Sequence, residues 1–145
     1  MKVRTSRRTI GGVALLGLVA MGTGCVSSGS ADQTIRLVPL ARPFEKDIPV
    51  PVGFRFVDSA SEDRSTGTHR LYLRHVYEGD AAKAAVRSFY REQMPLSRWV
   101  NTSDGNVNGE YTLRYEKETE VCTVLIRDRR SMRTGSQVQV VVSRK

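Results

Sequence analysis

The chain has 145 residues, a length that is enough for one domain and hardly for two. Its formal charge is +8, from 23 basic and 15 acidic residues, and every acidic residue follows Cys25. Without the four basic residues that precede Cys25, 19 basic residues stand against 15 acidic ones, a net charge of +4. This mild bias lacks the dense basic stripe and the aromatic residues of polyanion-binding proteins, so we expect no nucleic-acid partner.

Residues 1–24 have the features of an export signal. Residues 1–9 are basic and polar, residues 10–21 are apolar and uncharged, and small residues follow as far as Gly24. The apolar run has 12 residues, whereas a helix needs about 20 to cross a bilayer. The sequence therefore favours a cleaved signal peptide over a permanent transmembrane anchor.

Cys25 ends the tetrapeptide GTGC, which resembles the lipobox of bacterial lipoproteins. In that family the cysteine thiol is acylated, and the cysteine becomes the first residue of the mature protein. Thr23 and Gly24 match the pattern, whereas Gly22 occupies a place that usually holds leucine. The resemblance implies lipidation of Cys25 and a membrane as partner through that lipid. Ordinary signal cleavage beside an incidental cysteine is the alternative.

The segment SRRTI, residues 6–10, resembles a twin-arginine export motif, in which Arg7 and Arg8 would be the residues recognised. A plain basic start to a general secretion signal is an equally good interpretation. The residue after the cysteine is Val26 and not an aspartate. In bacterial lipoproteins this favours sorting to the outer membrane, if the source is Gram-negative. The expected location is the cell envelope, with the protein anchored by lipid on the periplasmic face.

Residues 25–47 are predicted to be the lipidated cysteine and a flexible, proline-rich tether. Residues 26–34 are rich in serine and glycine and cannot bury enough apolar surface to offset their ordering entropy. Four of the five prolines lie within residues 35–54, which indicates extended, non-helical chain. We place a single domain at residues 48–145.

Hydrophobic patterning within this domain predicts one helix and several strands. The period changes at residues 79–95, where Asp80 is a good N-cap, one stripe is apolar and Pro95 ends the helix. A polar loop is expected at residues 61–68, a short strand after the helix, and Trp99 in the core. The other strands are expected at 53–61, 69–79, 109–118, 120–129 and 136–145. The predicted class is α+β, with one amphipathic helix packed on one face of a mainly antiparallel sheet of four to six strands.

The segments IPVPVGF, FYREQMP and VCTVLI, together with the single tryptophan, are similar to small domains of bacterial envelope lipoproteins. The resemblance covers most of residues 48–128, and its motifs are packing motifs that imply a fold. A helix held against a sheet also looks like the layout of the domains of BamC, an accessory lipoprotein of outer-membrane assembly. That likeness concerns the fold, and function does not follow from it.

No constellation of residues in the sequence indicates catalysis, so we expect no enzyme, no cofactor and no metal. His69 and His75 lack nearby cysteines or paired carboxylates and make a poor metal site. Cys122 lies in an apolar strand, where a free cysteine usually packs as a small hydrophobic residue. The alternating glutamates at residues 116–120 are typical of a solvated hairpin tip.

One surface feature suggests a contact with a partner, because four arginines fall within seven residues of a predicted hairpin: Arg127, Arg129, Arg130 and Arg133. They could meet anionic lipid headgroups, an acidic protein or cell-wall polymers. The alternative is that these charges only keep a sheet edge from aggregating.

The leading hypothesis is a non-enzymatic envelope lipoprotein whose small domain binds or supports another envelope component. One rival is an enzyme with a dispersed site around His75, Tyr77 and Glu78, which a deep pocket converging on those side chains would favour. Another is a subunit of a larger secreted complex that adds a strand at a sheet edge, which an exposed, unpaired edge strand would favour.

Overall fold

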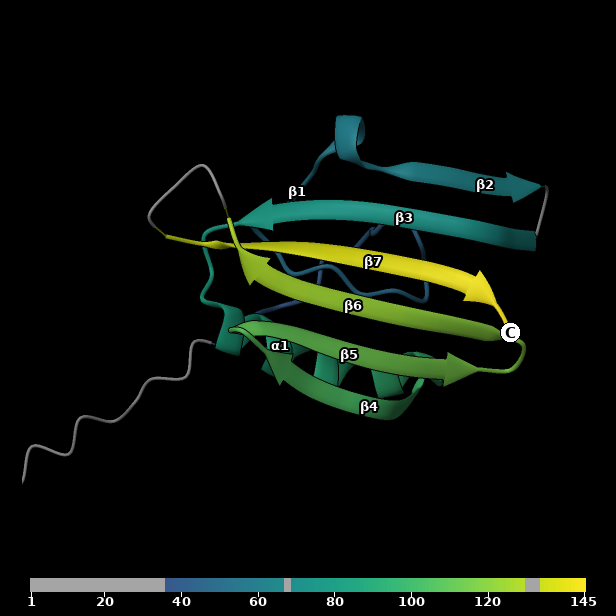
Figure 1. Cartoon of the computed structure of the whole chain (residues 1–145). Helices are drawn as coiled ribbons and strands as arrows, with labels where there is room; N and C mark the ends of the chain where they lie inside the picture. Colours follow the sequence, from purple (N-terminus) through teal and green to yellow (C-terminus); the bar gives the residue numbers. More distant parts are fainter. Residues whose placement is uncertain (1–35, 67–68, 130–133) are drawn as a thin grey trace, which may run out of the picture. The chain divides into compact units, whose positions relative to one another are not determined.

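Seven antiparallel strands form one sheet in the part of the chain that the computed structural model describes, residues 36–66, 69–129 and 134–145 (Figure 1). The order is β1-β3-β7-β6-β5-β4, and β2 also pairs with β3. The strands are β1 (Arg55–Phe56), β2 (Glu62–Thr66), β3 (His69–Gly79), β4 (Val100–Val107), β5 (Glu110–Lys117), β6 (Glu120–Asp128) and β7 (Ser136–Arg144). The helices of the described residues are η1 (Asp58–Ala60), α1 (Lys83–Gln93) and η2 (Met94–Ser97), of which only α1 is an α-helix.

The predicted α+β class is confirmed, with seven strands in place of the expected four to six. The difference arises mainly at residues 61–68, where a loop was expected and β2 forms instead. Four of its five residues are exposed, so the backbone pairs with β3 although no apolar periodicity marks a strand. The strand expected over 53–61 is shorter than predicted, because η1 follows β1 after one residue.

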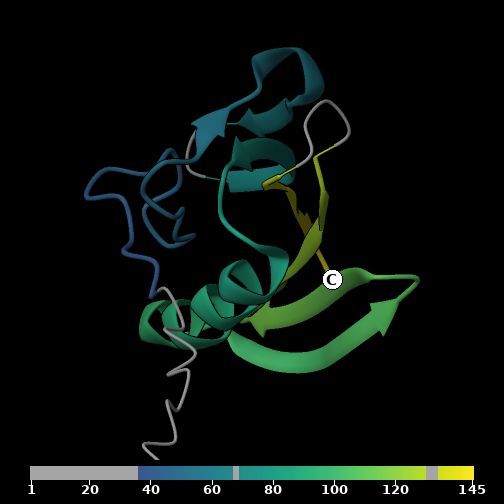
Figure 2. The same ribbon diagram turned by 90° about the vertical axis from the view of Figure 1, so that its left-hand side faces the viewer.

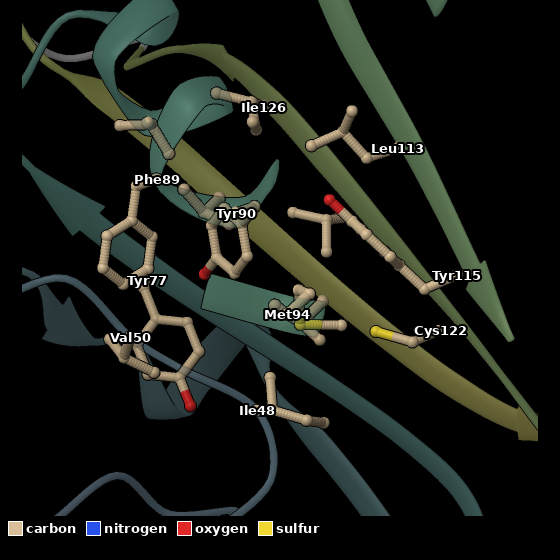
Figure 3. Close-up of a cluster of buried hydrophobic side chains, with 14 of the residues drawn as sticks. Ile48, Val50, Tyr77, Phe89, Tyr90, Met94, Leu113, Tyr115, Cys122 and Ile126 are labelled. Carbon is tan, nitrogen blue, oxygen red and sulfur yellow. The ribbon is translucent and has the colours of Figure 1, made fainter. Parts of the chain in front are cut away.

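The core lies between one face of the sheet and two covering elements. Figures 1 and 2 show α1 and the segment of residues 36–52 on the same side of the sheet. Figure 3 shows side chains from all three meeting, among them Ile48 from the segment, Tyr90 from α1 and Cys122 from β6. The largest fully buried side chain is Trp99, as expected for a residue placed in the core.

The packed chain begins earlier than the predicted boundary at residue 48. Residues 36–52, which we call the arm, fold back on themselves through an isolated bridge between Pro39 and Pro51 and hydrogen bonds on either side of it. Leu37 and Leu40 pack against the core, and Ile48 is buried. The prolines remove backbone donors, and for that reason the composition suggested a tether. They do not prevent apolar contacts, and the chain here packs against the core.

The helix starts later than predicted, because the residue at its N-cap is Ala82 and not Asp80. Asp80 instead forms an ion pair with Arg129, at 3.1 Å. At the other end Pro95 does not stop the chain from coiling, since the 3₁₀ helix η2 continues to Ser97. A left-handed residue, Arg98, then turns the chain toward β4 (φ 67°).

The opposite face of the sheet carries mostly polar side chains, although Val76 and Val121 are also buried there. There the Arg127 Nε donates a hydrogen bond to the Gln137 Oε1 (2.7 Å), and the Gln137 amide donates to Glu78 (2.9 Å). An antiparallel sheet with one packed face and one polar face is the expected arrangement for this class. No helix within residues 36–66, 69–129 and 134–145 is long and apolar enough to cross a bilayer.

Candidate functional site

Of the four arginines expected to meet a partner, the structure describes two, Arg127 and Arg129, and their surroundings differ. Arg127 is half-buried on the polar face of the sheet, where it binds Gln137. Arg129 is only 6% exposed and pairs with Asp80, so its side chain is not available to the partner or lipid contact expected of it. Arg130 and Arg133 lie outside the described residues. The contact expected of Arg127, Arg130 and Arg133 therefore stays a prediction.

His75 and Tyr77 share the packed face of β3, whereas Glu78 lies on the other face. The Tyr77 hydroxyl is 3.2 Å from the His75 Nδ1, and the ring of Phe56 meets His75 edge-on at 5.0 Å between centroids. Burial lowers the pKa of His75, which favours the neutral ring. Glu78 faces Arg55 (3.7 Å), so the three residues of the enzyme hypothesis do not converge.

The structure places Cys122 where its thiol is closed to solvent. Cys122 is fully buried in the core, as predicted, and burial raises the pKa of its thiol to about 12. A thiol with so high a pKa is not a nucleophile at neutral pH. No group of three or more histidine, cysteine, aspartate or glutamate side chains able to hold a metal ion occurs in the described ranges. His69, the other histidine considered as a ligand, begins β3.

The densest charge cluster in the described chain surrounds Arg70, a residue of β3 whose side chain is 15% exposed. Its guanidinium binds Asp47 through two bonds (2.7 and 2.9 Å) and Glu120 through two more (3.0 and 2.7 Å). A fifth bond, 3.1 Å long, reaches Glu45. Lys117, the last residue of β5, also binds Asp47 (2.7 Å). We call these five residues the Arg70 cluster.

The Arg70 cluster is closed, because an arginine has five N–H donors and all five are used. Two of its carboxylates come from the arm and one from β6, so the cluster fastens the arm to the sheet. Trp99 adds a further link, since its Nε1 donates a hydrogen bond to the Asp47 carbonyl oxygen (3.0 Å). Glu120, expected at a solvated tip, is therefore a member of this cluster, whereas Glu116 pairs with Lys145 (2.6 Å).

The two arm carboxylates titrate in opposite directions. Burial alone would raise the pKa of Asp47, but hydrogen bonds from Arg70 and Lys117 outweigh it and lower the pKa to about 2. Glu45 accepts a single bond, and there burial prevails and raises the pKa. Asp47 is thus the carboxylate through which protonation would weaken the cluster.

Acidification is expected to weaken the fold between about pH 4 and about pH 2. The folded pKa of Asp47 lies near 2 and its ordinary value is 3.8, so its stabilising contribution is present above pH 3.8 and is lost as the pH falls through 2. The difference between these two pKa values corresponds to about 2 kcal/mol in the free energy of unfolding. Urea unfolding of wild type and Asp47→Asn should give free energies that differ at pH 7 and converge toward pH 2. A difference that is constant over this range would contradict the role assigned to Asp47.

Two grooves adjoin these features. One, of about 830 Å³, has Phe44, Asp63 and the acidic members of the Arg70 cluster in its walls, so half of its eight charged lining residues already belong to the ion pairs of that cluster. The other, of about 620 Å³, lies between the start of the arm and α1 and contains Leu37, Phe89 and Leu96. Neither groove is lined by His75, Tyr77 or Glu78, the residues of the enzyme hypothesis.

The remaining candidate is the edge of the sheet at β4. In the described chain β4 pairs with β5 only, and seven of its eight residues are exposed. Val100 and Val107, at its two ends, are 64% and 70% exposed. An edge strand presents unpaired backbone N–H and C=O groups, which can accept another strand. Sequence reasoning missed this site, because it expected only a short strand there and the polar residues NTSDGN show no apolar alternation.

No protein family, no curated protein and no solved structure matches this chain.

Proposed function

We propose that the protein is a non-enzymatic envelope lipoprotein, held to a membrane by lipid on Cys25, whose small α+β domain binds or supports another envelope component. The observation that carries this proposal is the order of features before the domain: a basic start, a 12-residue apolar run, small residues and then Cys25. Arg7 and Arg8 would be read by the export machinery.

Because the packed chain begins early, few residues separate the lipid proposed for Cys25 from the domain. Arg36 pairs with Glu92 of α1 (3.2 Å), so ten residues, 26–35, lie between Cys25 and this first described contact. A Gly/Ser-like chain of this length spans on average about 15–20 Å. A domain on such a tether would work close to the membrane surface, on partners that are themselves in or near the membrane.

The β4 edge favours a second candidate function, that of a subunit in a larger secreted complex. Strand addition at a sheet edge gains main-chain hydrogen bonds with little demand on side-chain chemistry. This fits an edge that carries polar side chains and two exposed valines. The two functions are compatible, because a lipid anchor and a protein contact through β4 involve different parts of the chain.

Replacing Cys25 with serine is expected to abolish both acyl labelling and membrane fractionation of the full-length chain, because the hydroxyl does not take the place of the thiol in the thioether to lipid. Ser27→Ala, a small change two residues away, is the matched control and should behave as wild type. Labelling with a radioactive fatty acid and fractionation of cell lysates measure the two effects. Unchanged labelling and retention of Cys25→Ser would refute the anchor.

A further inference from the structure

The two edges of the sheet differ in how they are protected. At one edge β2 has five residues and carries Glu62, Asp63 and Arg64, charges of the kind that keep edges apart. At the other, β4 has eight residues, no lysine and no proline. Its one charged residue, Asp104, is turned to α1, where Arg87 and Arg91 lie 2.8 and 3.6 Å away. β4 is therefore the edge without its own outward charges.

The pairing of β4 with β5 fixes which face each β4 residue occupies. Asp104 pairs with Leu113 and Asn101 with Tyr115, and both partners are buried in the core. Val100 pairs with Glu116 and Val107 with Glu110, on the polar face. The two exposed valines therefore share one face of the sheet.

A bulge gives β4 a symmetric order of residues. The register shifts between Asn101 and Ser103, so Thr102 is the extra residue. Without it the paired positions read Val-Asn-Ser-Asp-Gly-Asn-Val, with valine at both ends, asparagine next to each valine and Asp104 at the centre. Two positions equally far from Asp104 also lie on the same face. An interface between identical copies requires this kind of self-complementarity.

We propose that β4 is the contact between two copies of this chain, paired antiparallel about a two-fold axis near Asp104. Val100 of one copy then packs on Val107 of the other, and Asn101 lies opposite Asn106. Both contacts occur twice by symmetry. A strand of an unrelated protein would gain nothing from this order, whereas a second copy matches valine with valine and asparagine with asparagine.

Charge at the centre of this pairing is offset locally. The two Asp104 carboxylates approach each other at the axis, and like charges directly opposite would weaken a strand pair. Each carboxylate arrives with the Arg87 guanidinium at 2.8 Å and Arg91 nearby, so the axis gathers cations as well as anions. The inference depends on β4 alone and not on the lipid proposed for Cys25.

Disulfide trapping tests both the contact and its register. Two tagged versions of the full-length chain, one with Val100→Cys and one with Val107→Cys, are co-expressed and oxidised with copper phenanthroline. The proposed pairing places these two positions opposite each other, within the 4.4–6.8 Å that a disulfide spans between Cα atoms. Position 100 is separated from its own copy by six strand steps, about 20 Å. We expect the mixed product to exceed the 100–100 product at least tenfold.

Other outcomes overturn the proposal. Equal amounts of mixed and 100–100 products would mean random collision, and a product of different mass would mean that β4 binds another protein. Both substitutions are at exposed positions, and Cys122 is buried, so the parent chain without added cysteines supplies the background from Cys25. Absence of any product above that background also refutes the contact.

Charge substitution gives an independent test by sedimentation of the full-length chain in detergent. The double variant Val100→Lys with Val107→Lys sets two lysines opposite each other at both ends and should weaken association at least tenfold. Val100→Lys with Val107→Glu sets opposite charges together and should restore it. Val52→Lys, which changes a valine that is 57% exposed outside β4, is the control and should associate as wild type. Equal association of all four chains would refute the proposal.

Discussion

Replacing Arg70 with leucine is expected to lower the free energy of unfolding by about 3 kcal/mol or more. The substitution leaves Asp47, Glu45 and Glu120 close together without the cation that binds all three. Lys117 then neutralises Asp47 only. Removing one partner from a partly buried cluster costs more than the cluster itself contributes, because the remaining charges are left desolvated. Urea unfolding at neutral pH, followed by circular dichroism, measures the loss.

Arg64→Leu is the matched control for this substitution. Arg64 also pairs with a glutamate, Glu62 at 2.6 Å, but its side chain is 72% exposed. Exposed pairs of this kind contribute between about 0 and 1 kcal/mol, so the control should stay close to wild type. A loss of similar size in Arg64→Leu and Arg70→Leu would show that burial of the Arg70 cluster is not what gives it its effect.

Trp99→Ala is expected to destabilise the domain by about 3–5 kcal/mol, the usual cost of removing a large buried ring. Trp99 is 1% exposed, its Nε1 donates to the Asp47 carbonyl oxygen, and the Lys117 ammonium lies 5.4 Å from its ring centroid. The substitution thus removes core volume and one attachment of the arm together. Because the chain has a single tryptophan, unfolding of this variant is followed by far-ultraviolet circular dichroism.

Trp99→Phe separates the two effects. The phenyl ring fills much of the same space, and only the hydrogen bond to the arm and part of the ring are lost, so a smaller cost of about 1–2 kcal/mol is expected. If Trp99→Phe were as harmful as Trp99→Ala, the hydrogen bond to Asp47 and not the packing would dominate. If both variants unfolded like wild type, Trp99 would not be the core residue that its burial indicates.

The C-terminal half of the fold was predictable because its strands carry strong periodic signals. The expected strands at 109–118, 120–129 and 136–145 differ from β5, β6 and β7 by about one residue at either end. The helix was predictable for the same reason: of its buried residues, Val86 and Phe89 lie on the expected apolar stripe and Tyr90 lies beside it. In these segments local patterning and tertiary packing require the same residues.

The arm and the Arg70 cluster were not predictable, because they depend on contacts between residues far apart in the chain. Asp47 and Arg70 are separated by 23 positions, and Glu120 is a further 50 residues along. A proline-rich stretch with scattered charges has the composition of a tether, and only its contacts with β3, β6 and Trp99 give it a fixed place. Arg129 was misplaced for the same reason, since Asp80 lies 49 residues before it.

The position of β7 in the sheet has a consequence for how the molecule is made. β7 is the last strand along the chain, yet it lies between β3 and β6. The ribosome therefore synthesises the strands from β1 through β3 and those from β4 through β6 before β7, the strand that joins the two groups. The facing edges of β3 and β6 have no partner until residues 136–144 emerge. Until then the nascent chain contains two incomplete groups of strands with unpaired edges, and a chaperone would bind it in this form.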